Sequence, residues 1–436
     1  MGRLSRAQSQ ERNRASVLAA ARSEFAERGF RDAKVDGIAQ RAGLTRGAVY
    51  SNFPGKRALY FAVLADLAER APARAGAPEP SRAGTARPGP ETLRGPEALP
   101  GPEALPGTDR TGRTGAGSGP TRGEPPLAVP ETGLVGVEPA APDSLSAAEA
   151  LGAFARAWVG RLPLADVGEP HGPARLGVHL LPEVLAEERI RRPFAQLMKL
   201  DAILLGLALE RLGPPGAAPG GLVRVAEAVL TTLHGANQMA AAAPGFIEPF
   251  NVVSACERLA GLDLHGWWPP AHVITQALPV DDPWIPPAAP HTLDAVRGEP
   301  ARLADDGVVA VLGMHRLEAI EEAVRAAPPG ARITAALVTG DPAELAPLAR
   351  LAVAELCGCL RQAFPPSAWP SLQVVFDESG ALAAAAGLPA VSDGTEAAVR
   401  IEAQRIVARA DGRGACHAAA SAVLSTPAST GGAGRD

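Results

Sequence analysis

The stretch over residues 35–60, VDGIAQRAGLTRGAVYSNFPGKRALY, constrains the fold of this chain more than any other. Its apolar residues recur at helical spacing in two short blocks, and a single glycine, Gly43, separates the blocks. Glycine adopts the left-handed conformation that ends many helices, because it has no Cβ. We therefore predict two short helices joined by a tight turn, followed by a third helix that begins near Lys56.

The second of these helices has an outer face suited to the DNA major groove. Thr45 stands where its hydroxyl can cap the helix, and Ala48, Val49 and Phe53 are expected to be buried. A helix this short is not stable alone in water, so it must pack against its neighbours. An outer face with one guanidinium, one phenol and small residues fits against base edges. The residues predicted to point outward are Arg46, Gly47, Tyr50 and Asn52.

Residues 10–70 share a spacing of small, apolar and glycine positions with a known DNA-binding head. The matching residues are Ala20, Ala21, Phe25, Gly29, Phe30, Val35, Ile38, Ala39, the runs AGLT at 42–45 and GAVY at 47–50, Phe53, Lys56 and Leu59. In this spacing the segment resembles the head of the TetR family of bacterial transcriptional regulators. The alternative is a helical hairpin with no role in nucleic-acid binding.

The resemblance implies a compact helical head with a defined set of DNA contacts. The first helix is expected over residues 11–28 with Gly29 as its cap, and residues 1–9 as a mobile arm. The family carries Thr or Ser before the helix at Val35, but this chain has Ala33-Lys34, so Asp32 is a candidate cap. By resemblance, the helix from Lys56 links the head to the body. The implied DNA-binding residues are Lys34, Thr45, Arg46, Gly47, Tyr50, Asn52 and Lys56.

Charge is distributed unevenly along the 436 residues. Residues 1–70 hold 13 Lys and Arg against 7 Asp and Glu, a net charge of +6, whereas the whole chain carries −5. A basic head on an acidic body attracts a polyanion at one end only. No signal peptide or apolar run long enough for a membrane helix is found, and four cysteines do not form a disulfide framework. We therefore expect a cytoplasmic protein with no membrane partner.

The length predicts roughly three domains, and composition places the boundaries. After the helix-turn-helix domain at 1–71, residues 72–143 are rich in Gly and Pro and contain the hexapeptide GPEALP twice in tandem. This segment is predicted to be a disordered insert, with a partner-binding role as the alternative. The later boundaries are a helical domain at 144–265, an α/β domain at 293–425 and a disordered tail at 426–436. Between the two domains, residues 266–292 are predicted to be an extended Pro- and Trp-rich connector that can lie against a neighbouring surface.

Residues 144–265 have a helical pattern. Helices are expected over residues 146–160, 174–181, 182–212, 222–241 and 249–260. Pro193 is a candidate position for a kink in the third of them. By position and helix count, this region matches the ligand-binding and dimerisation body of TetR proteins. The family packs its last two helices against a second copy. The residues that we place near that interface, with an ordinary core role as the equal alternative, are Val225, Val229, Leu233, Val253 and Leu259.

A ligand pocket in this helical body requires apolar walls and a few polar groups. The candidate ligand-binding residues are Trp158, His179, Phe194, Met198, His234 and Asn237, each of which also fits an ordinary core or interface role. The histidines do not stand at metal-ligand spacing, and no cluster of carboxylates or thiols accompanies them. No metal, cofactor or catalytic residue is therefore predicted.

The α/β domain at 293–425 resembles the thioredoxin-like fold. Its expected order is strand 308–312, helix 317–326, strand 333–338, helix 343–360, strand 372–376, a hairpin of 397–401 with 405–410, and a helix over 415–424. Met314-His315 stands where that fold carries its catalytic cysteine, and Gly394-Thr395 replaces its proline. Cys357 and Cys359 diverge on one helix, so we expect one in the core and one at the surface.

The sequence as a whole predicts an all-α TetR-like part followed by a thioredoxin-like α/β domain. The function predicted first is a non-enzymatic, dimeric repressor that a small-molecule inducer releases from a palindromic operator in double-stranded DNA. The alternative function is a redox sensor or thiol–disulfide enzyme that acts through the C-terminal domain.

Overall fold

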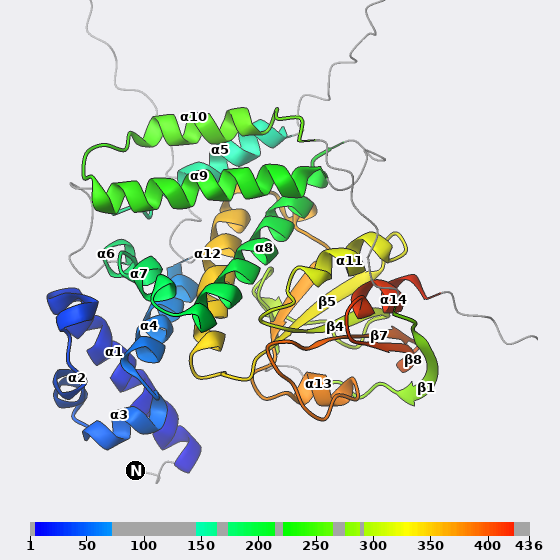
Figure 1. Cartoon of the computed structure of the whole chain (residues 1–436), viewed down its shortest axis with the longest axis horizontal. Coiled ribbons are helices and arrows are strands. Elements are labelled where there is room, and N and C mark those ends of the chain that lie inside the picture. Colours follow the sequence, from blue (N-terminus) through cyan, green and yellow to red (C-terminus); the bar gives the residue numbers. More distant parts are fainter. Residues whose placement is uncertain are drawn as a thin grey trace, which may run out of the picture. The chain divides into compact units, whose positions relative to one another are not determined.

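The computed structural model describes residues 5–71, 145–163, 173–213, 221–264, 275–287 and 292–422 (Figure 1). The predicted insert at 72–143, the tail at 426–436 and the connector residues Trp267 and Trp268 lie outside these ranges. Within the described helices, none combines the length and apolarity required to cross a membrane.

Four helices form the N-terminal head: α1 (Arg6–Asp32), α2 (Val35–Ala42), α3 (Arg46–Asn52) and α4 (Lys56–Arg70). Helix α1 begins earlier than predicted, because Ser5 caps it and Gln8 returns the hydrogen bond to the backbone of Ser5. Arg6 is therefore helical, and the predicted mobile arm is wrong from this residue onward. Gly29 interrupts α1 at a φ of 72°, as the predicted cap position requires, and one more turn follows it.

The helix-turn-helix has the predicted local structure. Gly43 ends α2 at a φ of 66°, and the Thr45 hydroxyl accepts a hydrogen bond from the backbone N–H of Ala48, 3.2 Å away. Val49 is buried on α3 and Phe53 just after it, so both hold the helix against the head. The suggestion that Asp32 caps α2 is wrong: Asp32 closes α1, and Lys34 stands at the cap position without a side-chain hydrogen bond.

The helical body contains α5 (Ala147–Val159), α6 (Pro173–Gly177), α7 (Leu180–Leu185), α8 (Glu188–Glu210), α9 (Leu222–Ala242) and α10 (Pro249–Leu259). Ser146 and Glu149 form a reciprocal cap at the start of α5. The helix predicted over 182–212 is wrong at its start, because the chain breaks at Glu187 between α7 and α8. Helix α8 continues through Pro193, which lies near its N-terminal end.

The residues that the sequence placed near a dimer interface lie inside this single chain. Val225, Val229 and Leu233 on α9 and Val253 on α10 are buried, and α10 packs against both α5 and α9. These four residues therefore lie in an ordinary intramolecular core, which was the alternative role. Leu259, the fifth of these residues, is only half-buried at the end of α10, and the contact with a second copy stays a prediction.

The C-terminal region is a mixed six-stranded sheet with the order β1-β8-β7-β4-β5-β6. Strands β4 (Gly307–Gly313), β5 (Arg332–Val338) and β6 (Leu372–Phe376) are parallel, and β7 (Glu396–Glu402) and β8 (Arg405–Asp411) continue the sheet in antiparallel pairs. The predicted order of strands and helices is confirmed. A separate short pair joins β2 (Leu293–Asp294) to β3 (Glu299–Pro300).

Part of the predicted connector belongs to this sheet. Residues of β1 (Leu278–Pro283) are extended, as predicted, and they pair with β8 at the edge of the sheet, so this segment lies against a neighbouring surface. Trp284 follows β1 and is buried, and its indole N–H donates to the carbonyl oxygen of Leu303 at 2.7 Å. The segment is thus fastened to the sheet by both backbone and side chain.

Helices cover both faces of the sheet: α11 (Ala319–Ala326), α12 (Leu345–Ala363), α13 (Ala381–Ala385) and α14 (Ala415–Ser421), with a 3₁₀ turn at Pro366–Ala368. One face, with Val309 and Val311, packs with α13 residues such as Leu382. The opposite face shares a single hydrophobic core with the helical body and the head. Helix α12 makes this connection, because it packs against α4, α5 and α8 (Figure 1).

Candidate nucleic-acid interface and internal cavity

Helix α3 presents a polar face to solvent. Arg46 and Gly47 are exposed, and the Tyr50 side chain is 40% exposed. The Arg46 guanidinium carbon lies 5.5 Å from the centroid of the Tyr50 ring, and its Nη1 is 3.5 Å from a carboxylate oxygen of Asp36. Both Arg46 and Asp36 are well exposed, so this ion pair is weak and exchangeable. The guanidinium is consequently available to an outside partner.

Two other predicted DNA-binding residues differ in exposure. Lys34 is exposed at the start of α2. Asn52 is only half-buried rather than turned fully outward, and its amide donates to the carbonyl oxygen of Ala48 at 2.8 Å. Its side chain therefore supports the last turn of α3. The role of each residue in DNA binding stays a prediction.

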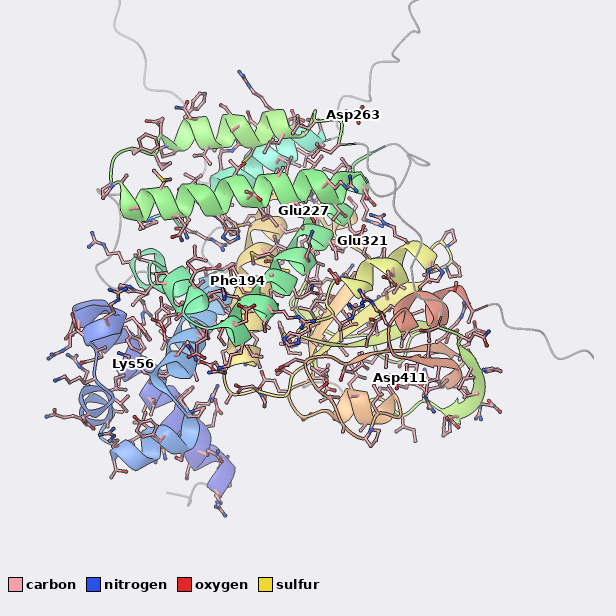
Figure 2. The ribbon with its side chains drawn as sticks, viewed as in Figure 1. Lys56, Phe194, Glu227, Asp263, Glu321 and Asp411 are labelled. Carbon is pink, nitrogen blue, oxygen red and sulfur yellow. The ribbon has the colours of Figure 1, made fainter. Side chains whose placement is uncertain are left out.

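Lys56 and Arg57 begin α4 but point to different surroundings. The Lys56 ammonium donates to the carbonyl oxygens of Arg31, at 3.1 Å, and Ala33, at 3.2 Å, which fastens α4 to the end of α1 (Figure 2). Arg57 is only 15% exposed and forms ion pairs with Glu187 and Glu344. The charge of Arg57 is therefore used inside the molecule.

A buried acid that sequence reasoning missed orients α2. Glu24 lies on α1 and forms ion pairs with Arg28, at 3.1 Å, and Arg41, at 2.9 Å. Gly37 on α2 allows this approach, because a Cβ there would come within 2.7 Å of the Glu24 carboxylate. The sequence signal was faint: one carboxylate interrupts the apolar stripe of α1, opposite a glycine on α2.

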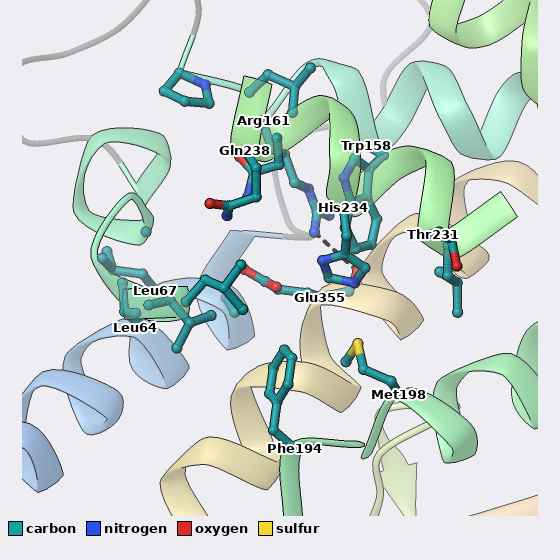
Figure 3. Close-up of a pocket in the computed structure, with 18 of the residues that line it drawn as sticks. Leu64, Leu67, Trp158, Arg161, Phe194, Met198, Thr231, His234, Gln238 and Glu355 are labelled. Carbon is teal, nitrogen blue, oxygen red and sulfur yellow. Dashed lines mark hydrogen bonds between the residues drawn. The ribbon is translucent and has the colours of Figure 1, made fainter. Parts of the chain in front are cut away.

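An internal cavity of about 740 Å³, partly open to solvent, lies among α4, α5, α6, α7, α8, α9 and α12 (Figure 3). Most of its wall is apolar, and its polar groups come from a few side chains, which suits a drug-sized organic ligand. Five of the six predicted ligand-binding residues line it: Trp158, Phe194, Met198, His234 and Asn237. The sixth, His179, is not part of the wall and lies near Gly29 of the head.

His234 is a neutral polar group in this wall. Its ring packs edge-on against Trp158 at 5.0 Å, and its Nε2 is buried without a hydrogen-bond partner among the described residues. Burial lowers the pKa of His234 to about 4, because the charged imidazolium would lose its hydration. At neutral pH the imidazole is uncharged and can exchange one hydrogen bond with a ligand.

Two acids that the sequence analysis did not select lie at or beside the cavity. Burial raises the pKa of Glu355, on α12, to about 7, and nearby Arg161 opposes that rise. Asp201, on α8, is 3% exposed, and burial together with Glu355 raises its pKa well above the ordinary value. Asp201, Glu355 and His234 line a second, much smaller hollow, which shares wall residues with the cavity. The sequence signal of the two acids was a carboxylate next to apolar residues, in LDAILL at 200–205 and AVAELCG at 352–358.

Arg161 approaches α12 closely from the end of α5. Its Nη1 donates to the backbone carbonyl oxygen of Glu355 at 3.1 Å. Gly358 permits this position, because a Cβ there would lie 2.8 Å from the guanidinium. The arginine is therefore held at the cavity wall by the backbone of α12 as well as by charge.

Ion pairs join α4 to α12 near both ends of α4. Arg57 of α4 pairs with Glu344, the residue that precedes α12, and Arg350 of α12 holds Glu69 of α4 through two hydrogen bonds of 2.7 and 2.8 Å. Glu187 completes the first pair, and its pKa is lowered to about 2 by Arg57 and Arg189. These contacts fix α4, the last helix of the head, to α12.

The described residues hold four cysteines, and all are buried and unpaired. The prediction of one surface cysteine on α12 is wrong, since Cys357 and Cys359 are both inaccessible. Burial raises the pKa of Cys359 and Cys256 to about 11, and it also raises that of Cys357 and Cys416. A neutral buried thiol is a poor nucleophile. Among the residues that the structure describes, no His, Cys, Asp and Glu cluster has the arrangement of a metal site.

Comparisons with known proteins identify the head. Residues 17–63 match the family model described as bacterial regulatory proteins, tetR family. The HTH-type transcriptional regulator SrpR of Pseudomonas putida is 47% identical over 55 residues, which is 13% of this chain and 26% of that protein. The uncharacterized HTH-type transcriptional regulator TtgW, also of Pseudomonas putida, is 45% identical over 65 residues, 15% of this chain and 48% of that protein. The chain thus spans about a quarter and about half of these relatives, within its N-terminal part.

Proposed function

We propose, from the TetR-family helix-turn-helix domain at residues 17–63, that this protein is a sequence-specific DNA-binding regulator of transcription. The observation that supports this most strongly is the exposed face of α3, where Arg46 and Tyr50 stand on a helix fixed by its cap and by Phe53. A guanidinium on a short exposed helix can bond two acceptors of a guanine in the major groove. The proposed setting is the cytoplasm, and the proposed role is non-enzymatic.

The proposed regulator acts as a homodimer on a palindromic operator, because two equivalent heads read two half-sites one helical turn apart. The side chains available for this contact lie at and just before the start of α10. Phe246 and Phe250 are 69% and 72% exposed, and Met239 near the end of α9 is also exposed. Large exposed apolar groups on neighbouring elements are typical of a protein interface.

The internal cavity is proposed to receive the small-molecule inducer. Leu64 and Leu67 of α4 form part of its wall, so the helix that carries the head touches the ligand directly. A ligand that binds better to one head spacing than to the other shifts the population toward that spacing. We infer that the favoured spacing fits the operator poorly, which makes the protein a repressor released by its inducer.

The α/β region is proposed to be a thioredoxin-like domain that packs and binds but performs no thiol chemistry. Its strand and helix order supports the likeness. Thiol–disulfide exchange needs an accessible thiolate, and the described cysteines are buried with raised pKa values. Met314, at the position where that fold carries its catalytic cysteine, is itself buried. The redox alternative therefore gains no support from the site.

The experiment that tests this function maps the DNA bound by the full chain in cells. We expect a small set of enriched regions that share an inverted repeat, among them the promoter of the protein's own gene. A variant with Arg46→Ala and Tyr50→Ala, made in the same background, should lose this enrichment while it accumulates to the same level. Equal enrichment for both proteins would contradict a reading role for α3.

A further inference from the structure

The wall of the internal cavity carries the carboxyl group of Glu355, and a second carboxyl group, that of Asp201, lies beside a smaller neighbouring hollow. The Glu355 side chain extends into the space bounded by Phe194, Leu67 and Gln238 (Figure 3). Within the described part of the chain, no hydrogen bond or ion pair to its carboxylate is found. One carboxylate oxygen of Asp201, which is almost fully buried, also lacks a hydrogen bond there. Glu355 is half-buried and its carboxylate faces the cavity, and a carboxylate that is partly removed from water without a partner is costly, so this arrangement favours a ligand that supplies one.

The other charged side chains of the wall are already engaged or lie at its rim. Lys199 forms an ion pair with Glu227. Arg161 donates a hydrogen bond to the backbone of α12 and lies against Gly358. Arg175, on α6, is exposed. Apart from the exposed Arg175, the Glu355 carboxylate is the charged group of this wall for which no hydrogen bond or ion pair is found in the described part of the chain, and Arg161 acts on it only through space.

We propose that the cavity binds an organic cation, a molecule with an aromatic or aliphatic body and a single positive charge that lies against the Glu355 carboxylate. This inference depends on the effector cavity of the proposed function and names the class of its ligand. Trp158 and Phe194 add aromatic rings to the same wall, and aromatic faces attract cations in a dry site. The acceptor comes from α12, so the C-terminal region takes part in recognising the ligand.

Proton release accompanies this binding. In the empty cavity the pKa of Glu355 is raised to about 7, and a cation beside the carboxylate favours its ionised form. His234 is neutral at this pH and contributes no proton, whereas Asp201 is a second candidate donor. Proton release measured after replacement of Glu355 alone therefore shows whether the released proton comes from Glu355 or from Asp201.

Two ions of the same size and shape but opposite charge test the proposal: tetraphenylphosphonium and tetraphenylborate. Calorimetric titrations at pH 7, in phosphate and in Tris, give the affinity of the full chain for each ion and the number of protons released. We expect tetraphenylphosphonium to bind at least about 10-fold more tightly than tetraphenylborate. Glu355→Gln should weaken the cation about 10- to 100-fold and abolish proton release, because it removes one charge-assisted contact.

The matched control is Glu355→Asp, which keeps the charge and should retain most of the affinity for the cation. A preference for tetraphenylborate would overturn the proposal and assign recognition to Arg161 instead. Equal binding of the two ions, binding of neither, or an unchanged affinity in Glu355→Gln would also overturn it. Operator binding by the same samples, measured without either ion, separates a failure of the ligand proposal from a failure of the regulator proposal. If the protein still binds the operator, the regulator function stands and only the ligand class is wrong.

Discussion

Charged residues of this chain fall into two groups according to whether the fold gives them a partner. Glu24 and Arg57 are partly or fully buried and are paired across helices, so they stabilise the arrangement of the head and its attachment. Arg46 has only a weak exposed contact, and the carboxylate of Glu355 has none among the described residues. Groups of the second kind gain most from an external partner, which is DNA for Arg46 and a ligand for Glu355.

Replacing Arg46 with Ala tests base reading by α3. The change should weaken operator binding by about 1–3 kcal/mol and relax the preference at one base pair of each half-site, because a bidentate contact to guanine is lost. Fluorescence anisotropy with a set of single-substituted duplexes measures both effects. Arg70→Ala, at the exposed far end of α4, is the control and should leave the affinity unchanged. Full selectivity in Arg46→Ala would remove this residue from the readers.

Replacing Glu355 with Gln tests the buried acid without any ligand. The folded-state pKa of about 7 exceeds the ordinary 4.5, so wild-type stability falls as pH rises from about 4.5 to about 7. The Gln variant lacks this titration. It should therefore exceed the wild type by about 1–3 kcal/mol in free energy of unfolding at pH 8, and match it near pH 4. Urea unfolding at both pH values gives the difference, and a constant difference would contradict a raised pKa.

At the scale of helices, the effect of a glycine on stability depends on how closely the neighbouring helix approaches it as well as on helix propensity. Helices α8 and α9 meet at Gly206, where an added Cβ would lie 2.6 Å from the Cα of Val223. That atom belongs to the backbone, so it cannot move aside cheaply. Gly235 lies on α9 with no atom within 4 Å of such a Cβ. The two glycines therefore occupy similar helices but differ in what surrounds them.

A pair of glycine-to-alanine changes separates these effects. Gly206→Ala should lower the free energy of unfolding by about 1–3 kcal/mol, because the clash exceeds the gain in helix propensity. Gly235→Ala should instead raise it by about 0.5–1 kcal/mol. Thermal and urea unfolding of both variants measures the sign. If both changes stabilise the protein, α8 and α9 do not approach each other as described.

The local pattern predicted most elements correctly, whereas their long-range placement was hidden. The cap at Thr45 and the break at Gly43 depend on a few neighbouring residues, so the sequence predicted both. Five of the six pocket candidates line the cavity, because apolar and polar groups on core-facing helices tend to meet there. Glu355 was missed because α12 looked like a crossover helix of the sheet. Its apolar residues surround the whole helix, a sign of burial on every side.

At the scale of the whole molecule, one hydrophobic core runs from the head through the helical body to a face of the sheet. Helix α12 belongs to the α/β region by chain order, yet it packs against α4, α5 and α8 and contributes to the cavity wall. A ligand in the cavity therefore contacts the helix that carries the head and the helix that anchors the sheet. The C-terminal region is in this sense part of the proposed sensor.

The buried thiols give a prediction for the whole protein. Peroxide treatment should leave operator affinity unchanged in the wild type, because no described cysteine offers an exposed thiolate. A thiol reagent should react slowly with the native protein. After denaturation it should react readily with all four cysteines. The variant with Cys357, Cys359 and Cys416 replaced by Ala is the comparison. Release of DNA by peroxide from the wild type but not from this variant would establish a redox sensor instead.

The measurement that tests the central claim most directly compares the affinity of the full chain for its mapped operator with that for a scrambled duplex. The two duplexes have the same length and base composition, and both titrations use the same salt concentration, because phosphate contacts alone give salt-dependent binding to any sequence. We predict that the operator binds at least about 10³-fold more tightly, and that Arg46→Ala narrows this ratio. Equal affinities for the two duplexes would contradict the proposal that this protein is a sequence-specific regulator.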